Sequence, residues 1–284
     1  IAANLLENGL DEPELEACVE RLYRDGQGLT LWAAAGMASE LPAATGISLT
    51  LTQLARPLRR GSQYMFAQLS EWSAPLTPEL MSVLAAGLFA DEVQIACAAA
   101  VLAEHFAQQS SEAFAAMGGT ALVDRAWQHW LEHEEPYPQS GGAIPNSPRA
   151  ALMRALISLG GDSDVIDRGR SDSRSDVRDI AKARFRELVL ATPEAVDAFL
   201  NDIESAKLPP HDLAAILRQE SDLTPNQVER IEAFLRSSSD SLRFNAMGIL
   251  NDRYLSAEAI AAHAERLHLD PNRQVSERAA GLRR

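Results

Sequence analysis

Cysteine is among the residue types that this sequence has little of. Of 284 residues only Cys18 and Cys97 are cysteines, which is too few for a disulfide framework in a chain of this size. Both lie at apolar positions of helical patterns, so we expect two buried free thiols. Such thiols favour a reducing compartment, and we expect a cytoplasmic protein.

Long apolar runs are missing as well. No uninterrupted run approaches the roughly 20 residues that a helix needs to span a bilayer. The N-terminus lacks the basic and then apolar segments of a secretory signal. We therefore expect a soluble protein with no membrane contact. Because the sequence begins at Ile1 instead of Met, we also expect that an upstream segment has been removed or omitted.

Basic residues are few, and lysine is nearly missing. The chain has 26 lysines and arginines against 40 acids, a net charge of −14, and only Lys182 and Lys207 are lysines. An acidic surface disfavours binding to nucleic acids or anionic membranes, since both depend on basic surface charge. The acids are unevenly spread, because residues 1–50 hold eight acids against two bases and residues 151–200 hold nine against eight.

Aromatic residues make up only 6 percent of the chain, although apolar residues make up 46 percent. The apolar content is therefore mostly alanine and leucine, which suit close packing of helices. Composition favours an all-α fold.

The segment 175–188 has the clearest pattern in the sequence. Val177, Ala181, Phe185 and Leu188 fall at helical spacing on one face, and charged residues occupy the other. This pattern predicts one half-buried helix. Prolines, glycines and capping residues predict further helices at 12–25, 29–40, 77–89, 92–106, 120–134, 149–159, 193–204, 210–220, 225–236, 239–253, 256–267 and 271–283, with a less regular pair over 48–72.

One long loop is expected at 135–148. Residues 136–148 hold four prolines and two glycines, which no regular element tolerates. In an array of helices, such an insertion projects from one edge, where binding loops often lie, although a tolerated disordered segment is an equal alternative.

The pattern of 175–188 recurs along the chain. With Val177 and Ala181 as anchors four residues apart, successive anchor pairs are separated by 34, 28, 58, 26, 36, 29 and 33 residues, and the interval of 58 contains the proline-rich loop. A period near 30 to 36 with two helices per unit is typical of a helical solenoid. The other anchor pairs are Leu31/Ala35, Met65/Leu69, Val93/Cys97, Ala151/Ala155, Leu213/Leu217, Leu242/Ala246 and Val275/Ala279.

Three of these copies resemble a known family. The segments 175–181, 239–246 and 272–279 each lead from a short Ser-, Asp- or Asn-containing turn toward an anchor pair, as in Ser-Asp-Val-Arg-Asp-Ile-Ala. They resemble the opening of the second helix in HEAT and HEAT-like repeats, most clearly over 160–284. The resemblance implies one array over 1–284, less regular in 1–75, as a right-handed superhelix of about eight helix pairs. Its second helices would line the concave surface.

The resemblance implies an architecture more than an activity. HEAT-like arrays mostly bind proteins, some bind DNA, and a minority are enzymes such as alkylpurine glycosylases or bilin lyases. We expect a protein-interaction scaffold or adaptor with an unidentified protein partner. The alternative is a nucleic-acid-binding or base-modifying, glycosylase-like protein. The sequence contains no phosphate-binding loop, nucleophile elbow or Cys-His pair, so an enzyme is unsupported, and we expect no cofactor.

A basic ridge on the helix at 175–188 is the first candidate site. Its residues stand four apart, a spacing at which like charges repel by about 0.2–0.5 kcal/mol per pair. Acids at Asp172, Asp179 and Glu187 offer compensation on a solvated face. The alternative is a site for an acidic peptide, a phosphate group or a nucleic-acid backbone. The ridge residues are Arg174, Arg178, Lys182 and Arg186.

The charges around Arg218 and Arg243 would distinguish a protein scaffold from a nucleic-acid-binding protein. A continuous basic strip that joins the ridge to both would favour nucleic acid, whereas acids that interrupt it would favour a scaffold.

Aromatic residues beside the long loop form the second candidate site. Trp127, Trp130 and Tyr137 are either core residues or a partly exposed patch for a protein partner.

His129 and His133 are a weak metal candidate. They are four residues apart on one helix face, but the order His-Trp-Leu-Glu-His differs from the His-Glu-x-x-His of zinc peptidases. With no third ligand in the sequence nearby, we expect no metal site.

Overall fold

The structure is a computed structural model. It describes residues 11–54, 62–133, 147–161, 163–217, 222–250 and 254–282. Within these ranges the chain forms helices and turns and no strand, which confirms the predicted all-α fold.

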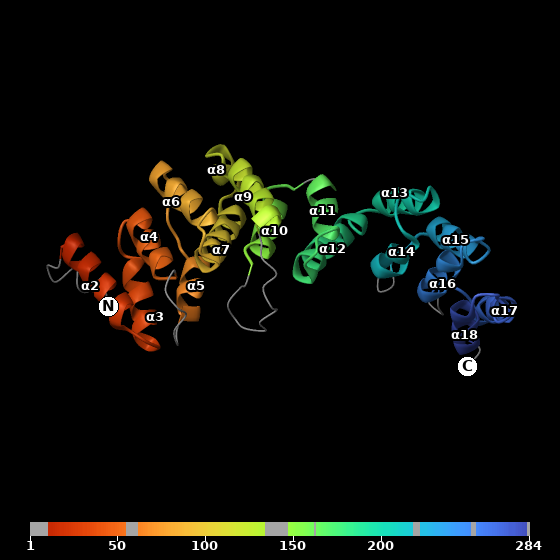
Figure 1. The fold of residues 1–284 in the computed structure, drawn as a ribbon. Helices are drawn as coiled ribbons and strands as arrows, with labels where there is room; N and C mark the ends of the chain where they lie inside the picture. Colours follow the sequence, from red (N-terminus) through yellow and green to blue (C-terminus); the bar gives the residue numbers. More distant parts are fainter. Residues whose placement is uncertain are drawn as a thin grey trace. The chain divides into compact units, whose positions relative to one another are not determined.

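Seventeen helices make up the described part of the chain (Figure 1). In order they are α2 (Glu12–Asp25), α3 (Leu29–Ala38), α4 (Ala43–Leu54), α5 (Ser62–Ser70), α6 (Pro78–Leu88), α7 (Val93–Gln109), α8 (Ser111–Ala116), α9 (Gly119–His133), α10 (Arg149–Ser158), α11 (Ser163–Arg170), α12 (Ser175–Val189), α13 (Pro193–Glu204), α14 (Pro210–Leu217), α15 (Pro225–Phe234), α16 (Asp240–Ile249), α17 (Ala257–Leu267) and α18 (Arg273–Leu282).

The contacts divide the chain into two units, Ile1–Lys182 and Ala183–Arg284. Each unit has its own hydrophobic core. The division falls within α12, between Lys182 and Ala183. The single array predicted over 1–284 stays a prediction.

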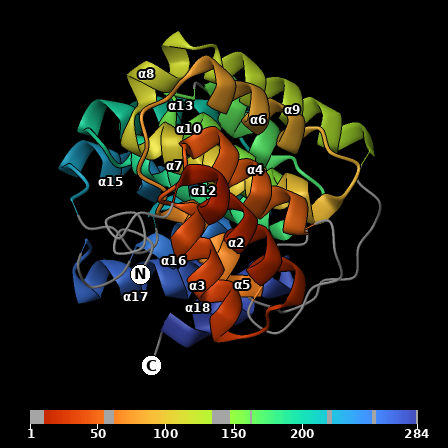
Figure 2. The ribbon, with the colours of Figure 1, turned by 90° about the vertical axis from the view of Figure 1, so that its left-hand side faces the viewer.

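In the first unit, helices pack as pairs and as two rows. The pairs are α2 with α3, α4 with α5, α6 with α7, and α9 with α10. The second helices of these pairs, α3, α5, α7 and α10, each contact the next along the chain, and so do the first helices α2, α4, α6 and α9. Figure 2 views this unit from the end at which α2 and α3 lie.

The second unit has the same pairing and a row of second helices. Its pairs are α13 with α14, α15 with α16, and α17 with α18, and the second helices α14, α16 and α18 contact one another in chain order (Figure 1). Rows of first and second helices are the defining contacts of an α-solenoid, in which each repeat buries its apolar face against its neighbours.

The anchor pairs of the sequence repeat all lie on second helices. Each of α3, α5, α7, α10, α12, α14, α16 and α18 carries one pair. The anchors are buried except Val93 and Leu242, which are partly buried. The described residues therefore contain the predicted number of about eight helix pairs. The segment 175–188 lies on a second helix.

The capping residues explain where several helices begin. Thr77, Thr192, Thr224 and Ser256 each accept a hydrogen bond from the backbone N–H three residues later. Proline follows each of the three threonines, where its missing N–H costs nothing. The predicted starts at these positions are confirmed.

Three helices differ from the prediction. Helix α4 begins at Ala43, before the less regular pair predicted over 48–72, and continues through Gly46. A Cβ at Gly46 would lie 2.1 Å from the carbonyl oxygen of Ala38, so glycine lets α4 approach the end of α3. The short helices α8 and α11 were not predicted, and α8 and α9 fill the long interval between anchors.

No helix in the described ranges combines the length and the apolar character needed to cross a membrane. Of the two cysteines, Cys97 is buried and Cys18 is partly buried, and both are free thiols.

Candidate functional site

Arg178, in the middle of the predicted ridge, is bound within its own repeat. One guanidinium nitrogen donates hydrogen bonds to the carbonyl oxygens of Asp172 (2.7 Å) and Ser173 (2.6 Å) in the turn before α12. These carbonyls follow the end of α11 and have no helical partner there. Arg178 therefore stabilises the turn between the two helices of the pair.

Arg174 is also paired locally. Its guanidinium contacts Asp176 through Nε (3.1 Å) and Nη2 (3.0 Å). Burial raises the pKa of Asp176, but the hydrogen bond and charge of Arg174 and the backbone N–H of Val177 outweigh burial, and the net effect is a lowered pKa. Asp176 was not among the acids predicted to compensate the ridge.

Lys182 is the ridge residue that is most open to a ligand. It lies on α12, its side chain is exposed, and it has no ion-pair partner among the residues that the structure describes. Arg186, the fourth ridge residue, is partly exposed and belongs to the second unit. Glu187, predicted as a compensating acid, pairs with Arg184 (3.0 Å).

Asp172 forms a buried ion pair with Arg149 that the sequence analysis missed. The Arg149 side chain is 4% exposed and that of Asp172 is fully buried. The Arg149 guanidinium also lies over the Trp127 ring, 5.8 Å from its centre. This pair links the start of α10 to the turn before α12. The sequence contained one signal for this pair, which is an arginine at the start of an otherwise apolar helix. An arginine at such a position is buried only when it has a partner.

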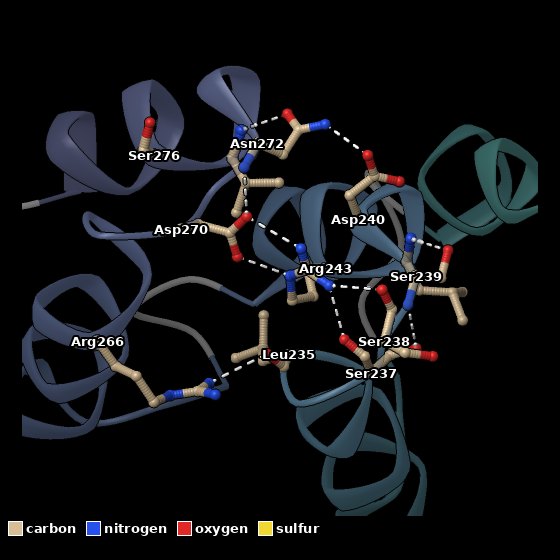
Figure 3. Close-up of polar contacts among 12 residues, drawn as sticks. Leu235, Ser237, Ser238, Ser239, Asp240, Arg243, Arg266, Asp270, Asn272 and Ser276 are labelled. Carbon is tan, nitrogen blue, oxygen red and sulfur yellow. Dashed lines mark hydrogen bonds and ion pairs between the residues drawn. The ribbon is translucent and has the colours of Figure 1, made fainter.

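In the second unit, Arg243 is the centre of a similar but larger network (Figure 3). Its Nη1 donates to the carbonyl oxygens of Ser237 (2.7 Å) and Ser238 (2.9 Å), as Arg178 does in its repeat. Its Nε and Nη2 bind both carboxylate oxygens of Asp270, at 2.7 and 2.9 Å. Arg243 therefore joins the turn before α16 to the turn before α18.

The Arg243–Asp270 pair is largely shielded from water, with side chains 12% and 6% exposed. The hydrogen bond from Arg243 lowers the pKa of Asp270, and the hydrogen bond to Asp270 raises the pKa of Arg243. Asp270 also accepts from the backbone N–H of Asn272, at the start of α18 (Figure 3). The charged groups of Arg243 and Asp270 therefore both make contacts within the fold.

Two predicted site residues, Arg218 and Tyr137, lie outside the described residues, as does most of the predicted loop at 135–148. The basic strip from the ridge through Arg218 to Arg243 therefore stays a prediction. Within the described residues, the guanidinium of Arg243 is already paired with the carboxylate of Asp270.

For two of the aromatic residues beside the loop, burial decides between the two predicted alternatives in favour of the core. Trp127 and Trp130 on α9 are 1% and 4% exposed, and both belong to the core of the first unit. The Trp130 indole N–H donates to the carbonyl oxygen of Leu88 at 2.8 Å. The spacing of two tryptophans along a helix does not show whether they face the core or water. Their burial identifies Trp127 and Trp130 as core packing residues.

His129 and His133 lie on one helix face as predicted, with stacked rings 4.3 Å apart. The Nδ1 atom of His133 lies 2.8 Å from the carbonyl oxygen of His129, and the His129 ring meets Phe89 edge-on. Within the described ranges, no group of three His, Cys, Asp or Glu residues is placed to hold a metal ion.

A groove of about 530 Å³ lies in the first unit, between the turn that precedes α4 and the turn that precedes α6. Its walls include Leu41, Pro42, Trp72 and Pro75, with the hydroxyls of Thr45 and Thr77 at the helix starts. The groove is mainly apolar and holds no cluster of titratable groups.

These contacts define the chain as a helical repeat array. A scan against models of protein families finds no match, and neither does a search of curated proteins. Among solved structures, the array is similar to two engineered proteins from the Northeast Structural Genomics Consortium and to a designed armadillo repeat protein.

The similarity to these structures is distant. The two engineered proteins are 14% and 15% identical, with TM-scores of 0.33 and 0.30; the alignments cover 92% and 93% of this chain and 76% and 94% of theirs. The armadillo protein is 14% identical, with a TM-score of 0.29, over 84% of this chain and 98% of its own. The description of the array therefore depends on its own helix contacts.

Proposed function

We propose that this chain is a protein-interaction scaffold whose partner binds along its second helices. The surface in question consists of the incompletely buried residues of the second helices α5, α7, α10 and α12 and, in the second unit, of α14, α16 and α18, and we refer to it as the second-helix surface. The observation that carries the proposal is the stacking of these helices in rows. A row of parallel helices provides an extended surface, which suits a macromolecular partner better than a small molecule.

The ridge on α12 is the proposed polar contact, and Lys182 is its principal residue. Arg174 and Arg178 already have local partners, so their side chains are held in place beside Lys182. A held guanidinium loses less conformational entropy when it binds an anion than a free one does. The proposed ligand group is a carboxylate or a phosphate on the partner, for example in an acidic peptide.

The chain offers a matched test, because it contains only two lysines. Lys182 lies on α12, and Lys207 lies in the turn after α13, where it pairs with Asp202. Lys182→Glu and Lys207→Glu change the net charge equally. Titration of a fluorescein-labelled acidic peptide and of its phosphorylated form should give binding that Lys182→Glu weakens by about tenfold or more and that Lys207→Glu leaves within twofold.

The same titration includes duplex and single-stranded oligonucleotides at low salt, which favours binding to phosphates. Equal loss of peptide binding in both lysine variants would remove the ridge from the site. Oligonucleotide binding that is tighter than peptide binding would replace the scaffold proposal with nucleic-acid binding.

A further inference from the structure

Two histidines near the end of α9 have stacked rings. The ring centres of His129 and His133 are 4.3 Å apart, and the two ring planes differ by 20°. One turn of helix separates these residues, which places both side chains on the same face. His133 is exposed and His129 is partly exposed. A small ion in solution therefore has access to both rings.

A hydrogen bond fixes which nitrogen of His133 carries the proton. Its Nδ1 atom lies 2.8 Å from the carbonyl oxygen of His129. A carbonyl oxygen only accepts hydrogen bonds, so Nδ1 must be the donor. The lone pair of the neutral ring is then on Nε2, which is the nitrogen that binds a metal ion. Metal-binding histidines typically donate their other ring N–H to a carbonyl or carboxylate oxygen in this way.

The ring of His129 is held by aromatic neighbours and has no polar partner in the described part of the chain. It meets the rings of Phe89 and Trp130 edge-on, with the ring centres 5.4 Å away in both cases. Within the described ranges, its ring nitrogens make no hydrogen bond. A nitrogen of His129 is therefore open to a ligand, beside Nε2 of His133.

Other histidines of the chain have a partner for one ring nitrogen. Nε2 of His105 lies 2.9 Å from the carbonyl oxygen of Trp72, and Nε2 of His263 lies 2.8 Å from a carboxylate oxygen of Glu232. Both of these contacts join separate elements of the fold. A metal ion that bound either nitrogen would have to break such a contact.

The spacing of the stacked rings suits a single ion. An ion bound to two imidazole nitrogens at about 2.0–2.1 Å, with the two bonds near a right angle, needs those nitrogens about 3 Å apart. Rings with centres 4.3 Å apart reach this arrangement by a small rotation of either side chain, because the torsion that turns a histidine ring has a broad minimum. Once one ring has bound the ion, the second ring is at high effective concentration, so the pair binds far more tightly than one ring alone.

The charges near the two histidines favour a cation. Both rings lie near the C-terminal end of α9, where the unpaired carbonyl groups of a helix attract positive charge. Glu132 is exposed next to His133, and the whole chain has a net charge of −14. Arg125, one turn before His129, opposes a cation, but its side chain is exposed and water weakens the repulsion.

Two nitrogen ligands also select the kind of ion. Imidazole suits Cu²⁺, Ni²⁺ and Zn²⁺, and the affinity of a given site for these ions is highest for Cu²⁺. A closed zinc site uses four protein ligands, whereas the described residues offer no group of three. Cu²⁺ accepts a tetragonal arrangement in which water fills the remaining positions. We propose that His129 and His133 form a two-histidine chelate site that binds divalent transition-metal ions, Cu²⁺ most tightly.

The sequence predicted no metal site at these residues, because a third ligand was missing. The structure adds the stacking of the two rings and the proton on Nδ1 of His133, and neither can be inferred from a spacing of four residues. The proposed site needs no third protein ligand.

Isothermal titration calorimetry of the complete chain with Cu²⁺ and with Ni²⁺ tests the site. The wild type should bind one ion at this pair, with Cu²⁺ bound more tightly than Ni²⁺. His129→Asn and His133→Asn should each weaken binding by at least tenfold, because a single ring remains. His211→Asn is the matched control, since His211 is 76% exposed in the second unit, and its affinity should stay within twofold of the wild type.

A displaced histidine separates chelation from the mere presence of histidines. The double variant Leu131→His/His133→Asn keeps the number of histidines but places the two rings two residues apart, on different faces of α9. Leu131 is 42% exposed, so this position tolerates a polar side chain. The double variant should bind Cu²⁺ at least tenfold more weakly than the wild type.

Electron paramagnetic resonance identifies the ligands of bound Cu²⁺. The wild-type spectrum should show splitting from two nitrogens, and the spectrum of His129→Asn should show splitting from one. Ni²⁺ should also raise the melting temperature of the wild type, because an ion that bridges two turns of a helix binds the folded chain in preference to the unfolded chain. The double variant should lose this rise.

Single substitutions at His129 and His133 that leave the Cu²⁺ affinity within twofold of the wild type overturn the proposal. So does a displaced histidine that binds Cu²⁺ as tightly as the natural pair, or a wild-type spectrum with a single nitrogen ligand.

Discussion

Arg178 and Arg243 hold the same position in two repeats, directly after the first anchor residue of a second helix. Each donates to two carbonyl oxygens in the turn that precedes its helix. The sequence predicted that Arg178 belongs to a binding ridge and that Arg243 extends it. The contacts add a structural role for both, which sequence spacing could not reveal because the acceptors are backbone atoms.

Breaking the Arg243–Asp270 pair should destabilise the second unit. Asp270→Asn removes one charge and leaves the largely buried Arg243 without its partner, which should cost about 2–4 kcal/mol of unfolding free energy near pH 7. Because Arg243 lowers the pKa of Asp270, this stabilisation is complete above the unfolded pKa of about 3.9 and is lost as the pH falls through the lower folded pKa. Urea unfolding of both proteins between pH 7 and pH 2.5 measures the difference, which should shrink below about pH 4.

Glu277→Gln is the control for this prediction. Glu277 pairs with Arg273 in the same unit, but these side chains are 61% and 88% exposed. Exposed pairs contribute little, so this variant should lie within about 0.5 kcal/mol of the wild type. A loss of equal size in both variants would show that burial does not strengthen the Arg243–Asp270 pair.

At the scale of the elements, the second helices were the most predictable part of the fold. Their anchors recur along the chain, and three of them, α12, α16 and α18, follow turns that contain Ser, Asp or Asn. Helix α8 escaped prediction because its six residues are too few for a recognisable apolar period, and the eight-residue α11 was missed as well. The early start of α4 also escaped prediction, since sequence alone does not show that the end of α3 lies against Gly46.

Close packing between helices depends on small residues, and Gly169 in α11 tests this. A Cβ there would lie 2.5 Å from Met153 Cε and 2.7 Å from the Cβ of the anchor residue Ala181. Gly169→Ala should therefore destabilise the protein by about 1–3 kcal/mol, although alanine is the better helix former. Thermal unfolding followed by circular dichroism measures the change.

Gly281→Ala is the matched control, because a Cβ at Gly281 would meet nothing within 4 Å in α18. This variant should be neutral or stabilising by up to about 1 kcal/mol. Equal effects at both positions would contradict the close approach of α11 and α12.

At the scale of the molecule, the sequence predicted an array of about eight helix pairs, and the described residues contain eight second helices with their anchors. The candidate site was less predictable. Trp127 and Trp130 proved to be core residues, Arg149 was missed, and the exposed Trp32 attracted no attention. Whether a side chain faces the core or water depends on which neighbouring helix lies against it, and a helical period of apolar residues does not contain that information.

We propose that partners bind along the second-helix surface, and site-specific photo-cross-linking distinguishes this surface from the first helices. A photoreactive amino acid at Ala67 on α5 should cross-link to the bound partner, whereas the same residue at Ala121 on the first helix α9 should not. Both alanines are exposed in the same unit. Ala215 on α14 and Ala198 on α13 form the equivalent pair in the second unit. Cross-links that are stronger from Ala121 and Ala198 would contradict the account, because the partner would then lie on the first helices.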